Sequence, residues 1–499
     1  MTSLRRNVIA NLVGRAWTNF LGILFVPLYL RFLGIESYGL IGFYTALQSI
    51  LGLLDLGIGS TMNRELARLS ALQGTDEEQR NVVRTLESIY WIIAVAGGGL
   101  IVFLAPYVSR HWVTSQGVPP EIVLKALRLM GIAVALQFPF SLYQGGLMGL
   151  QRQVLVNIIL SIIGTLRSGG AVLVLWLVSP SISAFLTWHI IVGIIGSLTL
   201  FAVLWQRLPQ SHIPAVFDKK ILAGLWKYSS AISANAIIGI ALTQMDKVVL
   251  SGMLPLKMFG YYALATTVSS AIWLFILPLN NAIFPRFVQL YEIGNLNQLK
   301  MLVHRSSQML AVALAPISVI LILFSGDILY LWTLDENVRT NAQLLVSLLV
   351  IGTTLNGIAS IPAYAVAAFG SPQLITIVNL CQATVVIPLI IVAVRNFGAP
   401  GAAFVWILLN STFVTIMAPL FFKRFMKGNY RNWVIRDNLM IFLPILIAAG
   451  GFYPIVKGVE GSLEKAFMLG FVWISLSLIG MCFSKYVREF LLNLKSRIM

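Results

Sequence analysis

Hydrophobic residues in this chain are gathered into long blocks, with polar residues confined to short segments between them. Apolar stretches of about 20 residues recur from one end of the sequence to the other. A helix of that length crosses a hydrocarbon core of roughly 30 Å. The pattern therefore predicts an all-α, polytopic membrane protein with about 14 transmembrane helices.

The predicted spans fall into two groups of seven. The first group covers residues 8–30, 38–62, 86–108, 122–150, 154–178, 182–206 and 228–253. The second group covers residues 259–285, 306–324, 343–369, 373–394, 401–422, 439–456 and 466–483. The basic start of the chain, residues 1–7, is read as the flank of a retained first span, because no convincing cleavage site follows it.

A long polar connection after the sixth span indicates the domain organisation. We expect an N-lobe over residues 1–206, a cytoplasmic linker over 207–227, a C-lobe over 228–425, and two further spans with a cytoplasmic tail over 426–499. A weak repeat supports this division, because residues 32–39 and 253–260 are both tight turns that end in an aromatic residue and a glycine. Two pseudo-symmetric six-helix lobes plus two C-terminal helices are a design that suits a transporter.

Composition and charge agree with a membrane protein. The chain is 58% hydrophobic and only 11% charged, yet its formal net charge is +17. Of the 35 lysines and arginines, 23 fall in segments on one side of the predicted membrane and 7 on the other. The richer side is cytoplasmic by the positive-inside rule, so both termini are predicted in the cytoplasm. This asymmetry explains the basic character without nucleic acid as a partner.

The sequence contains few features that would indicate an enzyme or a metal-dependent protein. Cys381 and Cys482 both lie inside predicted spans, and the histidines form no cluster with metal-ligand spacing. No phosphate-binding loop, nucleophile elbow or pair of catalytic acids is present, and the predicted outer loops are under about 20 residues long. We predict no enzyme activity and no cofactor, with proton or sodium coupling as the open question.

Charged residues inside the spans are the leading candidates for function. Arg15 and Arg167 lie in the first and fifth spans, where an arginine facing lipid costs roughly 2.5–3.5 kcal/mol. Polar residues also recur at intervals of three or four, which places them on one helix face. Such stripes include Asn11, Arg15, Asn19 and Gly22; Tyr44, Gln48, Asp55 and Gly59; Gln137, Ser141, Gln144 and Met148; and Asn235, Gly239, Thr243 and Asp246. They predict a water-filled cavity.

Two pairs of opposite charges leave alternatives open. Arg15 and Asp55 are equally far from the turn between their spans, so they reach similar depth, and the pair either fastens the first helical hairpin or serves a substrate. Asp246 and Lys247 are adjacent and point about 100° apart, so one of them has a structural role. Arg167 has no acid in its own helix and requires an anion or water. Arg64, at the cytoplasmic end of the second span, is either a gate or an orienting surface charge.

The segment Leu30-Arg31-Phe32-Leu33-Gly34-Ile35-Glu36-Ser37-Tyr38-Gly39, followed by Leu54-Asp55-Leu56-Gly57-Ile58-Gly59 and Asn63-Arg64-Glu65-Leu66-Ala67, resembles the amino-terminal signature of the polysaccharide transporter family. The segments Gln244-Met245-Asp246-Lys247-Val248-Val249-Leu250 and Phe259-Gly260-Tyr261-Tyr262-Ala263 resemble the matching signature of that family's second lobe. The family contains O-antigen and exopolysaccharide flippases, and its fold is shared with lipid II flippases and multidrug and toxin extrusion transporters.

The resemblance implies a function. It implies translocation of an undecaprenyl-diphosphate-linked oligosaccharide from the cytoplasmic to the outer face of the bacterial inner membrane by alternating access. Guanidinium groups suit a diphosphate because they bind it bidentately and keep their charge. Arg15 and Arg167 would then be the main contacts, with Lys247 third and Asp55 and Asp246 positioning them. Membrane lipids and the polymerase and chain-length proteins of the same pathway are the implied partners.

Two other functions compete with this interpretation. A cation-coupled multidrug and toxin extrusion exporter would share the architecture but would favour acids in its cavity, whereas the acids predicted at depth, Asp55 and Asp246, lie near bases. A glycosyltransferase, ligase or polymerase would need a sizeable outer loop, and the predicted loops are too short.

Overall fold

The computed structural model describes residues 14, 16–55 and 57–489, apart from the side chains of residues 220–236 and 372. Every named element within these residues is a helix, which confirms the all-α prediction. The chain divides into two compact units, Met1–Ala263 and Leu264–Met499. The lobe boundaries expected from the sequence stay predictions.

The first unit contains α2 (Val26–Leu51), the short 3-10 helix η1 (Gly52–Asp55), α3 (Ile58–Leu69), α4 (Asp76–His111), α5 (Pro120–Gln137), α6 (Pro139–Gly149), α7 (Gln153–Leu177), α8 (Ile182–Arg207) and α9 (Lys219–Met253). Helix α10 (Leu256–Ser270) contains the boundary between the units. The second unit continues with α11 (Trp273–Glu292), α12 (Leu296–Leu323), α13 (Ser325–Thr333), α14 (Glu336–Ala368), α15 (Pro372–Thr412), the π-helix η2 (Phe413–Met417), α16 (Ala418–Phe425), α17 (Tyr430–Asn432), the π-helix η3 (Trp433–Leu439), α18 (Met440–Lys457) and α19 (Ser462–Phe483).

Ten helices of the described chain are long and apolar enough to cross a membrane, and α10 with α11, bent by 41°, counts as one further span if the two helices cross together. Two of the long helices turn sharply at a glycine in the left-handed region, Gly34 (φ 76°) in α2 and Gly398 (φ 63°) in α15. Each of these helices therefore includes parts of two predicted spans. The total of fourteen remains a prediction, because part of the first span lies outside the described residues.

The second predicted span, residues 38–62, is not one continuous helix. Helix α2 ends at Leu51, and α3 begins after Gly57, whose φ of 71° is a conformation that glycine adopts without strain. The Asp55 Oδ1 atom accepts a hydrogen bond of 3.1 Å from the Gly59 amide, one of the donors left without a helical partner at the start of α3. Two glycines, Gly52 and Gly57, and Asp55 favour this break within the predicted span.

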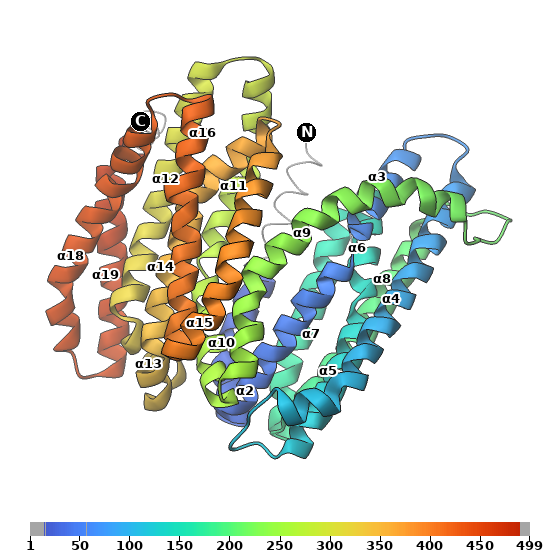
Figure 1. Ribbon diagram of the computed structural model, residues 1–499, viewed down its shortest axis with the longest axis horizontal. Helices are drawn as coiled ribbons and strands as arrows, with labels where there is room; N and C mark the ends of the chain where they lie inside the picture. The colour runs from blue at the N-terminus through green and yellow to red at the C-terminus, as the bar shows by residue number, and fades with distance from the viewer. Residues whose placement is uncertain (1–13, 15, 56, 490–499) are drawn as a thin grey trace. The chain divides into compact units, whose positions relative to one another are not determined.

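Helices α3 and α6 of the first unit pack unusually closely. A Cβ atom on Gly145 would lie 2.4 Å from the Gly59 carbonyl oxygen, and one on Gly149 would lie 2.5 Å from that of Asn63. Met62 of α3 is fully buried in the same core. In Figure 1, α4, α5 and α8 run side by side next to this pair. The close contact between α3 and α6 places the break in the helix at Asp55 next to α6.

In the second unit, α18 and α19 pack along α12 (Figure 1). Polar contacts fasten both ends of the pair. His304 of α12 contacts Asp437 of η3, and Lys457 of α18 donates to Asp327 of α13 at 2.7 Å. Between these ends, buried apolar residues of the three helices form one cluster that includes Ala311, Ala315, Ile441, Ile445, Val472 and Leu476.

Candidate functional site

A polar cavity of about 310 Å³ lies in the first unit among α2, η1, α5 and α6. Its polar lining residues are Gln48, Asp55, Gln137, Ser141 and Gln144. These residues belong to the two stripes predicted on the second and fourth spans. The structure therefore brings both stripes to one cavity, and Asp55 lines it from the helix break.

Hydrogen bonds between side chains hold one wall of this cavity in place. The Gln48 Nε2 atom donates to Gln137 Oε1 at 2.8 Å, and Gln137 Nε2 donates to the Tyr44 hydroxyl at 2.7 Å. The Tyr44 ring meets the ring of the buried His189 edge-on, at 5.9 Å between centroids. His189 bonds through Nδ1 to the Phe185 carbonyl at 3.0 Å, which gives it a structural role.

A second cavity of about 250 Å³ adjoins the first, and Gln144 lines both. Helix α7 contributes Arg167 to it, together with Asn157, Gly164 and Ser168. The Arg167 Nε atom is buried and has no hydrogen-bond partner among the described residues. Its electrostatic neighbours include Tyr44 and His189, which are neutral in their ordinary protonation states. Arg167 thus presents a positive charge to a polar cavity without a neighbouring carboxylate in the described chain.

The other cationic residue predicted for this cavity, Arg15, lies outside the described residues. The predicted ion pair between Arg15 and Asp55 therefore stays a prediction. Among the described atoms, Asp55 accepts from the Gly59 amide and is half-buried at the cavity wall. Its position leaves it available to a cation or to a polar substrate group.

Asp246 and Lys247 of α9 face different surroundings. Asp246 is buried, its Oδ2 atom accepts from the Tyr262 hydroxyl at 2.6 Å, and its Oδ1 atom has no partner in the described chain. Lys247 lines a separate, largely apolar cavity of about 210 Å³ with Phe43. Its Nζ atom donates to Gln244 Oε1 at 3.0 Å. Neither Asp246 nor Lys247 lines the two polar cavities, so their substrate roles remain predictions.

Arg64 lies on the exposed face of α3. Its neighbour Glu65 accepts a hydrogen bond of 2.8 Å from Arg68, and that bond raises the pKa of the Arg68 guanidinium. Arg68 also lies 3.4 Å from Glu78, so the end of α3 carries paired charges next to Arg64. This arrangement suits an orienting charge, and the gate role of Arg64 stays a prediction.

Glu87 of α4 is a buried acid that the sequence interpretation missed. Its side chain is only 5% exposed and accepts a hydrogen bond of 2.7 Å from the Tyr143 hydroxyl. The sequence did contain a signal, because Val83 and Tyr90 lie on the same helix face, four residues before and three after Glu87, and both are buried.

The chemistry of the site suits the binding of an anion. A guanidinium has five N–H donors, and a cavity that also holds amides and hydroxyls suits a phosphorylated or sugar-bearing ligand. Within the described residues no group of three or more His, Cys, Asp or Glu side chains could hold a metal ion. Both polar cavities lie between helices that are long and apolar enough to cross a membrane.

A bundle of apolar spans around polar cavities defines the protein as a polytopic membrane transporter of the α-helical class. The family model described as "Polysaccharide biosynthesis protein" matches residues 4–291, more than half of the chain, and a second model, MatE, matches residues 233–392. The chain therefore belongs to the polysaccharide biosynthesis protein family, in the superfamily that includes the multidrug and toxin extrusion transporters.

Similar proteins agree with this assignment. A Shigella flexneri protein named "Putative O-antigen transporter" is 24% identical over 405 residues, which cover 81% of this chain and 94% of that protein. The structure of the lipid II flippase MurJ in an inward closed conformation aligns with a TM-score of 0.70 at 14% identity, covering 95% of this chain and 98% of the other. An inward-facing multidrug resistance MATE transporter aligns with a TM-score of 0.64 at 14% identity, covering 84% and 94%. These structures share the fold with this chain.

Proposed function

We propose that this protein is a flippase for an undecaprenyl-diphosphate-linked oligosaccharide, an O-antigen or exopolysaccharide repeat unit. It moves this lipid-linked unit from the cytoplasmic to the outer face of the inner membrane by alternating access, with both termini in the cytoplasm. The O-antigen transporter relative supports the substrate class. The fold shared with a lipid II flippase supports the type of movement.

The observation that carries the proposal is the unpartnered charge of Arg167 in the polar cavity of the described chain. A buried cation without a carboxylate is unfavourable unless a ligand neutralises it. A diphosphate supplies two negative charges and matches the planar donor fork of arginine. In this proposal Arg167 and Arg15 hold the diphosphate, and Lys247 contributes a third charge during the cycle. Asp55 and Asp246 position these bases or take up a proton or sodium ion.

A cellular experiment tests the substrate and the direction of transport. When the gene is inactivated, complete lipid-linked units should accumulate on the cytoplasmic face of the inner membrane, and surface glycan should disappear. Arg167→Ala should reproduce the defect. Arg128→Ala is the matched control, because Arg128 is exposed on α5 and lines neither polar cavity. Units that accumulate on the outer face instead would contradict a flippase and indicate a polymerase or ligase.

The match of residues 233–392 to the MatE model supports a second candidate, a cation-coupled exporter of small molecules. The two functions differ in the phenotype of the same inactivated strain. Drug sensitivity with normal surface glycan would identify the exporter, and lost glycan with unchanged drug sensitivity would identify the flippase.

A further inference from the structure

The first unit contains another pocket, of about 520 Å³, among α4, α5, α6 and α8. None of its lining residues lines the polar cavities of Asp55 and Arg167. Its volume lies in the range of small-molecule binding sites. The proposed flippase mechanism does not use it.

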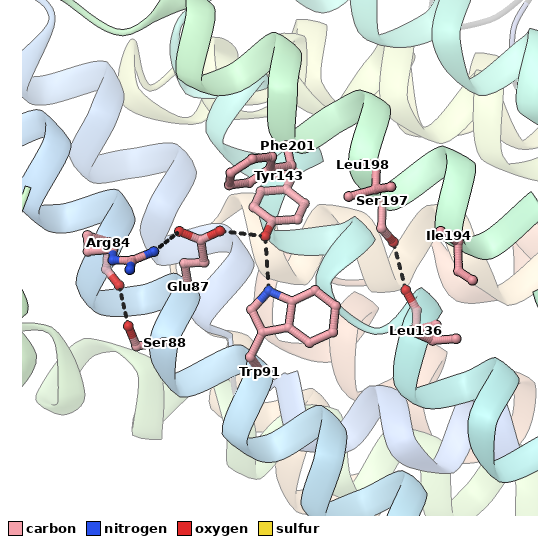
Figure 2. Close-up of a pocket in the computed structure, with 10 residues that line it drawn as sticks. All are labelled: Arg84, Glu87, Ser88, Trp91, Leu136, Tyr143, Ile194, Ser197, Leu198 and Phe201. Carbon is pink, nitrogen blue, oxygen red and sulfur yellow. Dashed lines mark hydrogen bonds and ion pairs between the residues drawn. The ribbon is translucent and has the colours of Figure 1, made fainter.

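One end of this pocket is charged, as Figure 2 shows, with Arg84 and Glu87 one turn apart on α4. The Glu87 carboxylate is 5% exposed, whereas the Arg84 side chain is 52% exposed. Glu87 Oε1 accepts from Tyr143 at 2.7 Å, but its Oε2 atom lies 3.5 Å from Arg84 Nη1. A good charge-assisted bond of this kind is about 2.7–2.9 Å long. Both groups therefore keep capacity for a further partner.

The other end of the pocket is mainly apolar, and its Ser197 hydroxyl already donates to the Leu136 carbonyl oxygen at 2.7 Å. Leu136, Ile194 and Leu198 line it, and Figure 2 shows them on the far side of Trp91 and Tyr143 from the charged pair. Leu198 is 59% exposed. This exposed apolar surface faces lipid chains when the unit is in a membrane, so the pocket opens toward hydrocarbon at this end.

A ligand that fits both ends has a charged head and a hydrocarbon tail. Its head meets one guanidinium and one carboxylate, which together carry no net charge. A purely anionic head would gain Arg84 but be repelled by Glu87. A zwitterionic head with a phosphate and a primary ammonium satisfies both groups. A primary ammonium donates hydrogen bonds to a carboxylate, whereas a quaternary ammonium has none to donate.

We propose that this pocket binds an aminophospholipid of the surrounding bilayer. The lipid phosphate binds Arg84, the primary ammonium binds Glu87, and the start of one acyl chain lies along the apolar end of the pocket. Tyr143 and Trp91 separate the two ends and hold the carboxylate in place, because Trp91 donates to the Tyr143 hydroxyl at 3.2 Å and Tyr143 donates to Glu87. The site is a lipid-binding site of the first unit, distinct from the proposed path of the transported lipid-linked unit.

Native mass spectrometry of the purified full-length protein tests this proposal without any transport measurement, so its outcome is independent of the proposed function. The delipidated protein is mixed with equal amounts of phosphatidylethanolamine, phosphatidylglycerol and phosphatidylcholine, and the retained lipids are counted. Phosphatidylethanolamine should be retained preferentially. Arg84→Ala and Glu87→Gln should each lower its retention about tenfold or more.

Two further variants separate lipid binding from misfolding. Arg110→Ala removes an exposed charge at the opposite end of α4 and should leave retention unchanged. Leu198→Trp should lower retention while both charges remain, because the larger side chain occupies the apolar end. Glu87→Gln itself keeps a carbonyl oxygen that accepts from Tyr143, so its fold should be preserved. Equal retention of the three lipids, or unchanged retention in Arg84→Ala and Glu87→Gln, would overturn the proposal.

Discussion

Arg167 carries a positive charge that is partly buried and has no partner in the described chain. Its Nε atom is buried without a hydrogen-bond partner in the described chain, yet its guanidinium lines a polar cavity. A residue kept only for stability would have a carboxylate or carbonyl partner. The absence of such a partner among the described residues favours a functional reason for this arginine.

Arg167→Met therefore should stabilise the protein while it stops transport. Replacing an unpaired buried charge by an apolar side chain should raise the free energy of unfolding by about 1–2 kcal/mol. Thermal unfolding of the purified protein in detergent measures this change, with Arg128→Met as the exposed control. A clear loss of stability in Arg167→Met alone would show that Arg167 is a structural residue.

The sequence predicted the polar stripes better than the partners of individual residues. Gln48, Asp55 and Gln137 were expected on cavity-facing helix faces, and all three line one cavity. Periodicity identifies a face because the helix repeat is fixed. Glu87 was missed because it lies at the end of a predicted span, where an acid can also face water, although Val83 and Tyr90 mark an apolar face beside it. Arg167 lies in the adjoining cavity because of how α7 packs against other helices. The residue pattern of one helix carries no information about such packing.

At the scale of helices, the close contact of α3 with α6 sets the position of Asp55. Gly145 permits this contact, because an added Cβ atom would lie 2.4 Å from the Gly59 carbonyl oxygen. Gly145→Ala should push the helices apart and lower the free energy of unfolding by about 1–3 kcal/mol. Thermal unfolding measures the stability, and glycan export measures the effect on the cavity.

Gly99→Ala is the matched control for this prediction. Gly99 lies within α4, and an added Cβ atom there would meet nothing within 4 Å. The substitution should be neutral or stabilise the helix by up to about 1 kcal/mol. Equal effects of Gly145→Ala and Gly99→Ala would contradict the packing argument.

Within the second unit, Asp327 of α13 forms ion pairs with residues of α14, α18 and α19. This buried carboxylate lies 2.7 Å from Lys457, 3.6 Å from Arg339 and 3.6 Å from Lys465. Asp327→Asn leaves three cations together without their anion, and it should lower the free energy of unfolding by about 2 kcal/mol, a value reduced because the cations are partly solvated. Chemical unfolding measures the change. Glu336→Gln, at an exposed partner of Arg339, should have little effect, and equal effects of both would refute a special role for Asp327.

At the scale of the whole molecule, hydropathy predicted membrane-spanning helices, and the described residues contain 10 such helices, or 11 with the bent pair, but it did not predict the breaks within them. In a membrane, a hydrophobic block of about 20 residues must satisfy its backbone hydrogen bonds internally, which an α-helix does. The approximate positions of spans therefore follow from hydrophobic composition. The break between Leu51 and Ile58 depends on a glycine with φ of 71° and on the bond from Gly59 to Asp55. Such local contacts are invisible in a hydropathy pattern.

The predicted orientation can be tested with single cysteines. Cys381 and Cys482 are free thiols and are first replaced by serine. Gln116→Cys lies on the predicted outer side and should react with a membrane-impermeant thiol reagent in intact cells with an opened outer membrane. Gln73→Cys lies on the predicted cytoplasmic side and should react only after the inner membrane is permeabilised. The reverse pattern would contradict cytoplasmic termini.

Translocation in a purified system tests the central claim most directly. The protein is reconstituted into vesicles that carry a fluorescent undecaprenyl-diphosphate-linked oligosaccharide in both leaflets, and an impermeant glycosidase outside the vesicles reports how much of it becomes accessible. The wild-type protein should expose nearly all of the substrate, while Arg167→Ala vesicles should expose only the half that starts outside. Accessibility that stays at one half with correctly folded wild-type protein, under an imposed proton or sodium gradient as well as without one, would contradict the account.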